Sequence, residues 1–307
     1  MVLTGRIMSA GELGSMPCSV PQDLLDRLVR ESVEVRTGRA GTLRLVSEEA
    51  LKAAAAEGEG GGPAARRDLE LALLARGVVP RRYLRNVDSL GLDGQARLLR
   101  ARVGVAGLGG LGGLVSELLA RAGVGELVLV DPDVTSDDNL NRQLLADEKN
   151  LGRAKVDAAA ARLGAVNSAT RVTTFRLRGD ADSFSRVFRG AVVLVDCLDS
   201  IPARFALEDA ARSLGVPLVH GAVGGFSGHV TCVFPDDPGL EALYGPRTEA
   251  AAQGVESVVG TPSPTPAVVA ALEVTEVLKI IAGVGEPLRR KLLTFDTASP
   301  YFAVVEL

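Results

Sequence analysis

One junction limits the fold of this chain more than any other feature: the apolar run RVGVA at 102–106 leads directly into the glycine-rich sequence GLGGLGG at 107–113. A helical pattern follows near 112–122. In a strand–turn–helix unit, the first glycine of GxGxxG allows the tight turn, the second lets the backbone approach a phosphate, and the third lets helix and strand pack closely. The N–H groups at the start of that helix favour anions. The residues that we expect to contact a nucleotide here are Gly107, Gly109, Gly110 and Gly112.

From Arg102 onwards the chain alternates between β-rich apolar runs and helical stretches. The runs are RVGVA, LVLVD, RVTTF, AVVLVD and VPLVH, and the helical stretches lie near 112–122, 152–166 and 203–214. This alternation is typical of repeated βαβ units, so it predicts a doubly wound, Rossmann-like α/β fold with a mostly parallel sheet. HVTCVF, LLTF and FAVVEL predict that the sheet continues into mixed, antiparallel strands. A composition with 47% hydrophobic but only 4% aromatic residues fits this class.

Residues 1–80 show a different pattern, and we expect them to form a small helical appendage of unknown role, ahead of a main domain at 81–307. A helix is predicted from Pro21, a short hairpin in VEVRTGRAGTLRLV, and a helix capped by Ser47. The low-complexity stretch 53–67 predicts a helix end and a linker, and the leucines before Gly77 predict another helix. In the main domain, residues 236–262 read as a long loop, which in a compact domain is usually functional or disordered.

Charge and cysteine content exclude several classes of protein. The formal net charge is −4 and no Lys/Arg block occurs, so we expect no nucleic-acid partner. The apolar stretch 267–285 carries two glutamates and a lysine, and the N-terminus lacks a signal-peptide core, so we expect no membrane span. The three cysteines, Cys18, Cys197 and Cys232, are widely spaced, so neither a disulfide framework nor a zinc site is expected. A cytoplasmic location is the resulting expectation.

An acid ends the strand that follows the glycine loop. Asp131 stands after ELVLV at the spacing of an acid that hydrogen-bonds ribose hydroxyls, and Asp133 follows it. A ribose belongs to NAD and to ATP alike, so this pair does not choose between them. The motif GxxxxGK[ST] of P-loop ATPases is absent from the sequence.

The polar run after Asp131 favours chemistry at phosphorus. Asn139, Arg142 and Gln143 follow this strand end, and Lys155 starts the next helical stretch. Ligands of doubly wound sheets bind beyond the carboxyl ends of the strands. A guanidinium there can meet two phosphate oxygens, whereas a nicotinamide ring needs a flat apolar slot. The acids Asp196 and Asp199 follow another strand, where a carboxylate can hold Mg²⁺. Taken singly, each residue also fits a structural role, as a surface ion pair, a solvated helix residue or a helix N-cap.

Several motifs occur in an order that resembles the ThiF/MoeB/HesA family, the bacterial relatives of ubiquitin-activating enzymes. The resemblance covers roughly residues 82–307. The motifs are RYLRN, GLDGQARLLRARV, GLGGLGG, DPDV, NLNRQ, GRAK, DCLDS with Arg204, VPLVHGAVGGFSGHVTCVFP and ALEVTEVLKIIAG. The resemblance implies an ATP- and Mg²⁺-dependent adenylyltransferase that activates the C-terminal Gly-Gly carboxylate of a small β-grasp sulfur-carrier or ubiquitin-like protein. Thiamine, a molybdenum or tungsten pterin, or another sulfur-transfer route are all open as the pathway.

The resemblance also implies roles for single residues. Asp131 would hold the ribose, Asn139, Arg142 and Lys155 the phosphates, and Asp199 the Mg²⁺. Arg85 matches the family's arginine that reaches across a homodimer into the partner's ATP site. An α-carboxylate is ionised at neutral pH, so the reaction needs aligned anions and charge relief rather than a general base. This chemistry explains why no catalytic His or Cys stands near the motifs.

The chain departs from the family at its cysteines. Many members carry two CxxC pairs for zinc and an acceptor cysteine in the loop before the late helix, and this chain has neither. We therefore expect no structural zinc and no covalent thioester step. Cys197, Cys232, His220 and His229 are expected to be structural, and Asp199-Ser200 replaces the usual Asp-Asn. Two other functions remain open: an NAD(P)-dependent oxidoreductase, which would leave Arg142 and Lys155 without roles, and a non-catalytic scaffold that keeps the fold.

Overall fold

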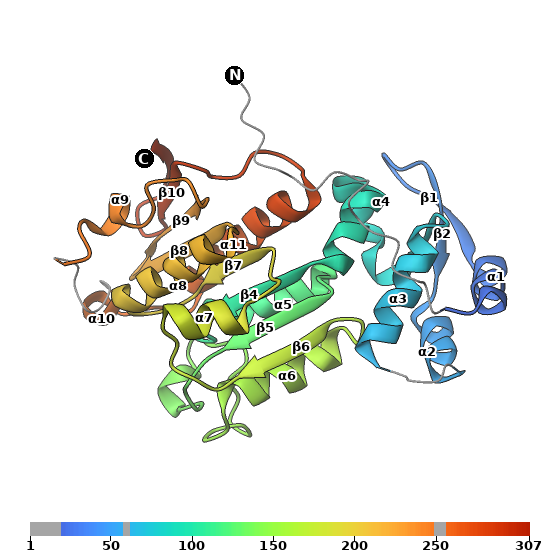
Figure 1. The fold of residues 1–307 in the computed structure, drawn as a ribbon, viewed down its shortest axis with the longest axis horizontal. Coiled ribbons are helices and arrows are strands. Elements are labelled where there is room, and N and C mark those ends of the chain that lie inside the picture. The colour runs from blue at the N-terminus through green and yellow to red at the C-terminus, as the bar shows by residue number, and fades with distance from the viewer. Residues whose placement is uncertain (1–19, 58–61, 249–255) are drawn as a thin grey trace.

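The computed structural model describes residues 20–57, 62–248 and 256–307. An eight-stranded sheet forms the larger part and a three-stranded sheet with its helices forms a smaller part at the N-terminal side (Figure 1). The strands of the large sheet have the order β11-β10-β9-β8-β7-β4-β5-β6. Their bounds are β4 Arg102–Ala106, β5 Glu126–Val130, β6 Arg171–Phe175, β7 Val193–Asp196, β8 Leu218–Gly224, β9 Ser227–Val233, β10 Lys291–Asp296 and β11 Tyr301–Glu306.

Five strands of the large sheet, β4 to β8, pair in parallel, and the pairs β8–β9, β9–β10 and β10–β11 are antiparallel. The predicted change from parallel to antiparallel strands is therefore confirmed. The chain order reverses between β4 and β7, since β5 and β6 are added on one side of β4 and β7 and β8 on the other. In doubly wound sheets, such a reversal leaves a crevice outside the carboxyl ends of the strands, where ligands bind.

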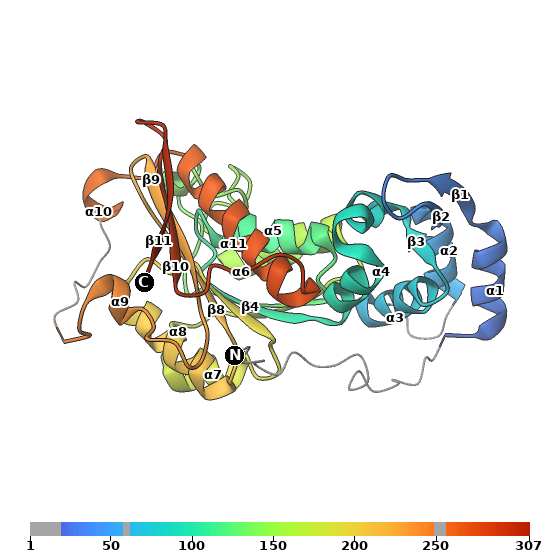
Figure 2. The ribbon, with the colours of Figure 1, turned by 90° about the horizontal axis from the view of Figure 1, so that it is seen from above.

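Helices cover both faces of the large sheet, as Figure 2 shows from above. One face packs against α4 Leu84–Arg100, α5 Gly112–Ala122, α6 Lys155–Val166 and α11 Pro264–Ala282. The other face packs against α7 Ala181–Val187 and α8 Ile201–Leu214. The central parallel strands β4, β5 and β7 are almost wholly apolar because both of their faces are buried, which is why they read as continuous runs in the sequence, whereas the edge strand β6 is only partly buried. Among the described residues, no helix is long and apolar enough to cross a membrane.

Four helices begin at the carboxyl edge of the parallel strands. Helices α5 and α8 start soon after β4 and β7, and the start of α6 returns to the end of β5, where the amide of Lys155 donates to the carbonyl oxygen of Asp133. Helix α11 starts there too, because Thr265 donates to the carbonyl oxygen of Gly225 in the turn after β8. This edge therefore gathers helix N-termini around the crevice.

The N-terminal part contains more than helices. Its elements are α1 Gln22–Glu31, β1 Val33–Arg36, β2 Thr42–Val46, α2 Glu48–Glu57, α3 Pro63–Leu74 and β3 Val78–Pro80. The predicted hairpin is confirmed as the antiparallel pair β1–β2, but β3 adds a parallel strand beside β2 that the sequence analysis missed. The description of this appendage as helical was thus incomplete, and the division at residue 80 stays a prediction. Cys18 lies outside the described residues.

A buried polar junction joins the two parts. The short helix η1 Arg81–Tyr83 follows β3 and leads into α4. The Tyr83 hydroxyl lies 3.1 Å from Oε2 of Glu70 in α3, and Nδ2 of Asn167, after α6, donates to it at 3.0 Å. Arg66 pairs with the same Glu70 at 2.9 Å. Burial is the largest influence on the pKa of Glu70 and raises it, although Arg66 and Arg82 oppose the shift.

The segment after β9 runs back along α8 towards the carboxyl edge. Near the end of α8, Arg212 donates to the carbonyl oxygens of Pro235 and Asp237. Near the start of α8, Arg204 contacts Tyr244, the last residue of the short helix α9 Glu241–Tyr244. A second short helix, α10 Glu256–Val259, precedes α11. The loop predicted at 236–262 is therefore anchored to α8 over its first part.

Candidate functional site

The glycine loop lies at the reversal of strand order, between the ends of β4 and β7. Gly107 has a φ of +88°, and a β-carbon on it would lie 2.4 Å from the carbonyl oxygen of Cys197. A β-carbon on Gly112 would lie 1.8 Å from the carbonyl oxygen of Gly107. Both positions therefore require glycine, for the close turn and for helix–strand packing, as the sequence predicted.

The backbone of this loop presents amides to the crevice. Within the described parts of the chain, the N–H groups of Gly109, Gly110 and Gly112 donate no hydrogen bond. They stand at the start of α5, where the helix dipole adds positive potential. Such amides bind the oxygens of phosphate groups. Neither Gly109 nor Gly110 has a close backbone neighbour, so a ligand can approach the chain there.

Asp131 braces the glycine loop from the next strand. Its Oδ2 accepts the amide of Leu108 at 2.7 Å and its Oδ1 accepts the amide of Asp133 at 2.8 Å. Burial, the largest influence, raises the pKa of Asp131, while nearby Lys155 opposes the shift. Each carboxylate oxygen keeps a further lone pair, so a ribose hydroxyl can still be accepted. The ribose contact stays a prediction, and the bracing role is an additional finding.

Asp133 and Lys155 come together at the start of α6. Their side chains form an ion pair with 3.3 Å between Nζ and Oδ2. The backbone holds them there, because the amide of Lys155 donates to the carbonyl oxygen of Asp133 at 3.0 Å and Val134 forms a bridge with Ala154. The Lys155 ammonium thus stands at the same strand end as Asp131, within reach of a bound anion.

The NLNRQ stretch forms a tight loop around the short helix η2 Asp137–Asn139. Asn139 is buried, and its Oδ1 accepts the amide of Ser136 at 3.2 Å, so it shapes this loop. The Arg142 guanidinium donates through one nitrogen, Nη1, to the carbonyl oxygen of Asp138 and to Asn141, both at 2.8 Å. Its other nitrogens have no partner among the described residues. The buried Gln143 faces the loop, since its Nε2 lies 3.8 Å from the position of a β-carbon on Gly109.

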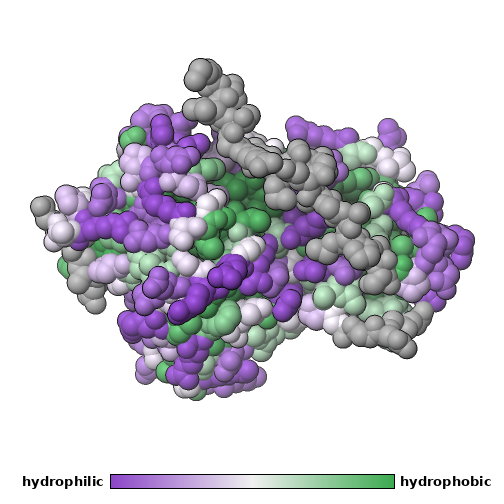
Figure 3. Space-filling view, in the orientation of Figure 1, coloured by the Kyte–Doolittle hydropathy of each residue, from purple (hydrophilic) through white to green (hydrophobic). Residues whose placement is uncertain are grey.

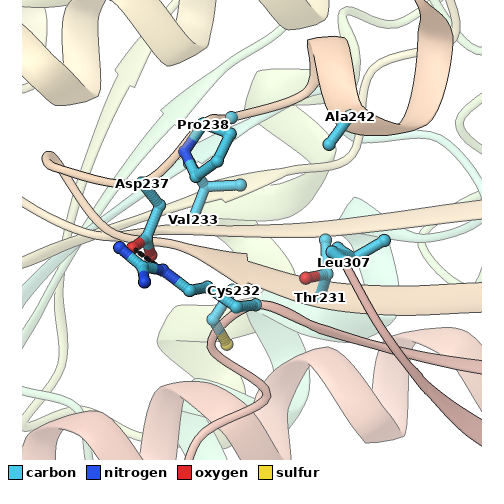
Figure 4. A pocket seen from close by; sticks show the side chains of 9 residues that line it. Thr231, Cys232, Val233, Asp237, Pro238, Ala242 and Leu307 are labelled. Atoms are coloured by element: carbon cyan, nitrogen blue, oxygen red, sulfur yellow. Dashed lines mark hydrogen bonds and ion pairs between the residues drawn. The ribbon is translucent and has the colours of Figure 1, made fainter.

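A cavity of about 340 Å³ opens beside Arg142. It lies between the glycine loop, the NLNRQ stretch and the start of α11. Its lining residues are Gly110, Leu114, Leu140, Asn141, Arg142, Gln143, Leu144, Ala146, Ser263 and Ala267. A much smaller cavity of about 20 Å³ lies beside Cys232 and Asp237 (Figure 4), where Asp237 pairs with Arg289 and Arg290. The smaller one is far too small for a nucleotide, so the site is the crevice at the glycine loop.

Asp199 is available to a cation. It follows β7 at the carboxyl edge, is exposed, and makes no hydrogen bond or ion pair within the described residues. A hard carboxylate oxygen of this kind suits Mg²⁺, which proteins commonly bind through one or two carboxylates together with substrate phosphates. Asp196, by contrast, is fully buried. Asp199 therefore fits the predicted metal role, whereas Asp196 is not available for it.

Arg85 lies far from the glycine loop of its own chain. It is an exposed residue of α4, two positions after Tyr83. Tyr83 packs against Gly123 and Asn167, which follow the C-terminal ends of α5 and α6. Those ends lie at the opposite edge of the sheet from the helix starts. Arg85 therefore cannot join Arg142 and Lys155 within one chain.

The structure also reveals a polar cluster that the sequence analysis missed. Asp196 and His220 stand opposite each other in the β7–β8 register, and Oδ2 of the acid lies 2.7 Å from Nδ1 of the imidazole. The imidazole Nε2 lies 2.9 Å from the Tyr244 hydroxyl. His229 contacts the same Nε2 at 3.4 Å. Burial, the largest influence, lowers the pKa of His220, and it lowers that of His229 to about 3. Both imidazoles are neutral at neutral pH.

The described cysteines are buried thiols, as predicted. Burial is the largest cause that raises the pKa of both Cys197 and Cys232, so neither forms a thiolate readily. Within the three described ranges, no group of three or more His, Cys, Asp or Glu side chains could hold a metal ion.

On the face of the molecule seen in Figure 3, hydrophilic and hydrophobic residues are interspersed.

Known proteins are similar in sequence to nearly three quarters of this chain. The model of the ThiF family matches residues 83–307. The SAMP-activating enzyme E1 of Haloferax volcanii is 37% identical over 226 residues, which cover 73% of this chain and 84% of that protein. The sulfur carrier protein adenylyltransferase of Thermus thermophilus is 35% identical over 239 residues, covering 72% and 84%. The mouse adenylyltransferase and sulfurtransferase MOCS3 is 37% identical, and the match spans 50% of its length.

Solved structures share the fold. Escherichia coli MccB, in a structure with MccA, superposes with a TM-score of 0.63 at 20% identity, over 91% of this chain and 96% of that chain. Another MccB structure has a TM-score of 0.61 at 25% identity, over 74% and 71%. The doubly wound sheet, the glycine loop and these sequence matches agree, and the chain belongs to the ThiF family.

Proposed function

We propose that this protein is an ATP-dependent adenylyltransferase, which activates the C-terminal Gly-Gly carboxylate of a small β-grasp sulfur-carrier protein as an acyl-adenylate. The observation that carries the proposal is that Arg142, Lys155 and Asp199 follow strand ends at the sheet edge that holds the amides of the glycine loop, with Arg142 beside Gly110. The named activities of the relatives from Haloferax volcanii and Thermus thermophilus support it.

The residues at this site supply the alignment and the neutralisation of charge that the uncatalysed reaction lacks. A terminal carboxylate is already ionised at neutral pH, so no base has to remove a proton. The difficulty is to bring that anion to the α-phosphorus of a polyanion. The loop amides hold phosphate oxygens, Lys155 and Arg142 offset their charge, and the loop braced by Asp131 keeps these donors fixed. Bound Mg²⁺, held by Asp199, would neutralise further phosphate charge.

A homodimer completes the proposed site. Arg85 is exposed at the opposite edge of its own sheet, so a second copy of the chain would have to bring its Arg85 to the phosphates. The large cavity beside Arg142 leaves room for such a side chain. A carboxyl terminus and ATP then meet two arginines and one lysine.

A peptide is a second candidate substrate. The likeness to MccB solved with MccA covers 91% of this chain, well beyond the 73% that matches the Haloferax volcanii enzyme. The additional matched region includes part of the N-terminal appendage. Among the described residues, β1 is an exposed edge strand of that appendage, and the backbone groups on its outer side suit pairing with an extended peptide.

Exchange of labelled pyrophosphate into ATP tests the function. The full chain is incubated with a β-grasp carrier ending in Gly-Gly, with the same carrier lacking its last glycine, and with peptides encoded beside this protein. Exchange with the intact carrier alone supports the proposal, and exchange with a peptide alone supports the second candidate. No exchange with any of them, together with tight NADH binding, would favour an oxidoreductase, and partner binding without exchange would favour a scaffold.

A further inference from the structure

A closed ring of hydrogen bonds surrounds the turn that carries Asp199. Inside the turn, the amide of Leu198 donates to Oδ1 of Asp196 at 3.1 Å. On its other side, the carbonyl oxygen of Leu198 accepts from Arg204 twice, from Nε at 3.1 Å and from Nη2 at 2.9 Å. Leu198 is the residue directly before Asp199. The position of the Asp199 carboxylate therefore depends on Asp196 and Arg204.

Tyr244 and His220 connect Arg204 to Asp196, the two residues that hold Leu198. The Tyr244 hydroxyl accepts a hydrogen bond from Nη1 of Arg204, so its own proton is directed to Nε2 of His220, 2.9 Å away. With Nε2 accepting, the imidazole carries its proton on Nδ1 and donates it to Asp196 at 2.7 Å. The lowered pKa of His220, caused chiefly by burial, agrees with this neutral tautomer. Arg204 thereby donates to both of its neighbours in the ring, Leu198 and Tyr244, and Asp196 accepts from both of its own, Leu198 and His220.

The ring links two segments that are far apart in sequence. Tyr244 belongs to the segment between β9 and α11, and its ring also packs edge-on against Phe205 of α8. Its neighbours hold the same segment to α8, since Glu208 accepts the amide of Leu240 and Asp209 pairs with Arg247 at 2.7 Å. Asp199, on the opposite side of the ring, is exposed at the nucleotide crevice. A displacement of Tyr244 would therefore remove one support from Arg204 and one from His220.

We propose that Tyr244 and His220 are positioning residues, which hold the Leu198 turn so that the Asp199 carboxylate is presented to the cation of a bound nucleotide. Neither residue belongs to the set that we propose to contact the phosphates. They couple the segment before α11 to the geometry of the phosphate site, so that movement of this segment alters the strength of cation binding. This inference rests on the proposed function for its nucleotide-binding and kinetic parts, whereas the hydrogen-exchange part is independent of that function.

The test uses the full chain with Tyr244→Phe, which removes the hydroxyl but keeps the ring on Phe205. Tyr301→Phe is the matched control, because Tyr301 is exposed on β11 and its hydroxyl has no partner among the described residues. Hydrogen exchange by mass spectrometry follows the Leu198 amide, and calorimetry measures ATP affinity with Mg²⁺ and with a chelator. We expect Tyr244→Phe to speed exchange at Leu198 about fivefold, as for the loss of one hydrogen bond. The gain in ATP affinity from Mg²⁺ should fall by a similar factor, with chelator-only affinity unchanged.

Arg204→Lys provides a second comparison, since lysine cannot make both contacts to the Leu198 carbonyl. If both variants break one ring, the double variant loses little more than the more severe single variant. Unchanged exchange at Leu198 in Tyr244→Phe, or an unchanged effect of Mg²⁺, would overturn the inference. If the wild-type protein shows no pyrophosphate exchange with any substrate, the proposed function fails. The hydrogen-exchange result still decides whether the ring holds the turn. Pyrophosphate-exchange kinetics of Tyr244→Phe decide only whether its kcat falls while its KM for the carrier stays constant.

Discussion

Gly112 lies so close to Gly107 that a β-carbon on Gly112 would stand 1.8 Å from the carbonyl oxygen of Gly107. This contact fixes the path from β4 into α5. Gly112→Ala should therefore force the loop apart, destabilise the protein by roughly 1–3 kcal/mol and abolish ATP binding. Thermal unfolding and ATP calorimetry measure both effects.

Gly164→Ala is the control for that substitution. Gly164 lies within α6, and nothing stands within 4 Å of an added β-carbon. Alanine should stabilise this helix by roughly 0.5–1 kcal/mol and leave ATP binding unchanged. Equal ATP affinity in Gly112→Ala and the wild-type protein would contradict the role of the loop.

Arg142→Ala should reduce pyrophosphate exchange by roughly 100-fold, since it removes one charged donor from the transition state. Arg142→Lys should recover only part of this loss, because an ammonium cannot bind two oxygens in parallel. The control is Arg153→Ala, because this arginine is exposed and, among the described residues, its side chain donates to the carbonyl oxygen of Asp157 alone. An active Arg142→Ala enzyme would remove this residue from the mechanism.

Glu273 gives the protein a distinctive pH dependence. Its carboxyl is fully buried in α11 without a hydrogen-bond partner among the described residues. Burial, followed by the charge of Asp196, raises its pKa well above 4.5. At a pH above the ordinary carboxyl value but below the raised pKa, the unfolded chain releases this proton while the folded protein keeps it. The free energy of unfolding therefore falls over this range as the pH rises, by about 1.4 kcal/mol per pH unit.

Glu273→Gln removes this dependence, so the stability of the variant relative to the wild-type protein should grow from pH 4.5 upwards and level off once the pH passes the raised pKa of the folded state. Denaturant unfolding between pH 5 and about 8 measures the difference. Glu148→Gln, at an exposed position whose side chain has no partner in the described part of the chain, should show no such trend. Parallel pH profiles for Glu273→Gln and the wild-type protein would mean that Glu273 is ionised in the folded state.

Tyr83→Phe should weaken the junction between the appendage and the main domain. It leaves Glu70 and Asn167 each without one buried hydrogen bond, at a cost of roughly 1–3 kcal/mol. Tyr301→Phe, on the exposed strand β11, should cost less than about 0.5 kcal/mol. Chemical denaturation compares the two, and equal stability would show that the junction contributes nothing.

The sequence was sufficient to predict the large sheet because its central parallel strands, β4, β5 and β7, are buried on both faces. Residues 102–106, 126–130 and 193–196 read as apolar runs, and each of them is a strand in the structure. Strand β3 was missed because only three residues pair with β2, too few to show a pattern, and the last of them is Pro80. Its parallel pairing depends on tertiary contacts of α3 rather than on local sequence.

The sequence predicted which residues belong to the candidate site but not which hydrogen bonds these residues make. The order of motifs identified Asp131 and Asp199, yet both look alike as acids at strand ends. Only the structure shows that Asp131 accepts two backbone amides while Asp199 has no partner among the described residues. The pairing of Asp196 with His220 could not be inferred either, since it depends on the register between β7 and β8.

The gathering of four helix starts at one edge has an electrostatic consequence. Each N-terminus of α5, α6, α8 and α11 contributes roughly half an elementary charge of positive potential, fixed in place by the backbone. Although the whole chain has a formal charge of −4, a dissolved polyanion should therefore be drawn towards this rim before it meets any side chain. Its rate of capture should consequently decline as added salt screens the field.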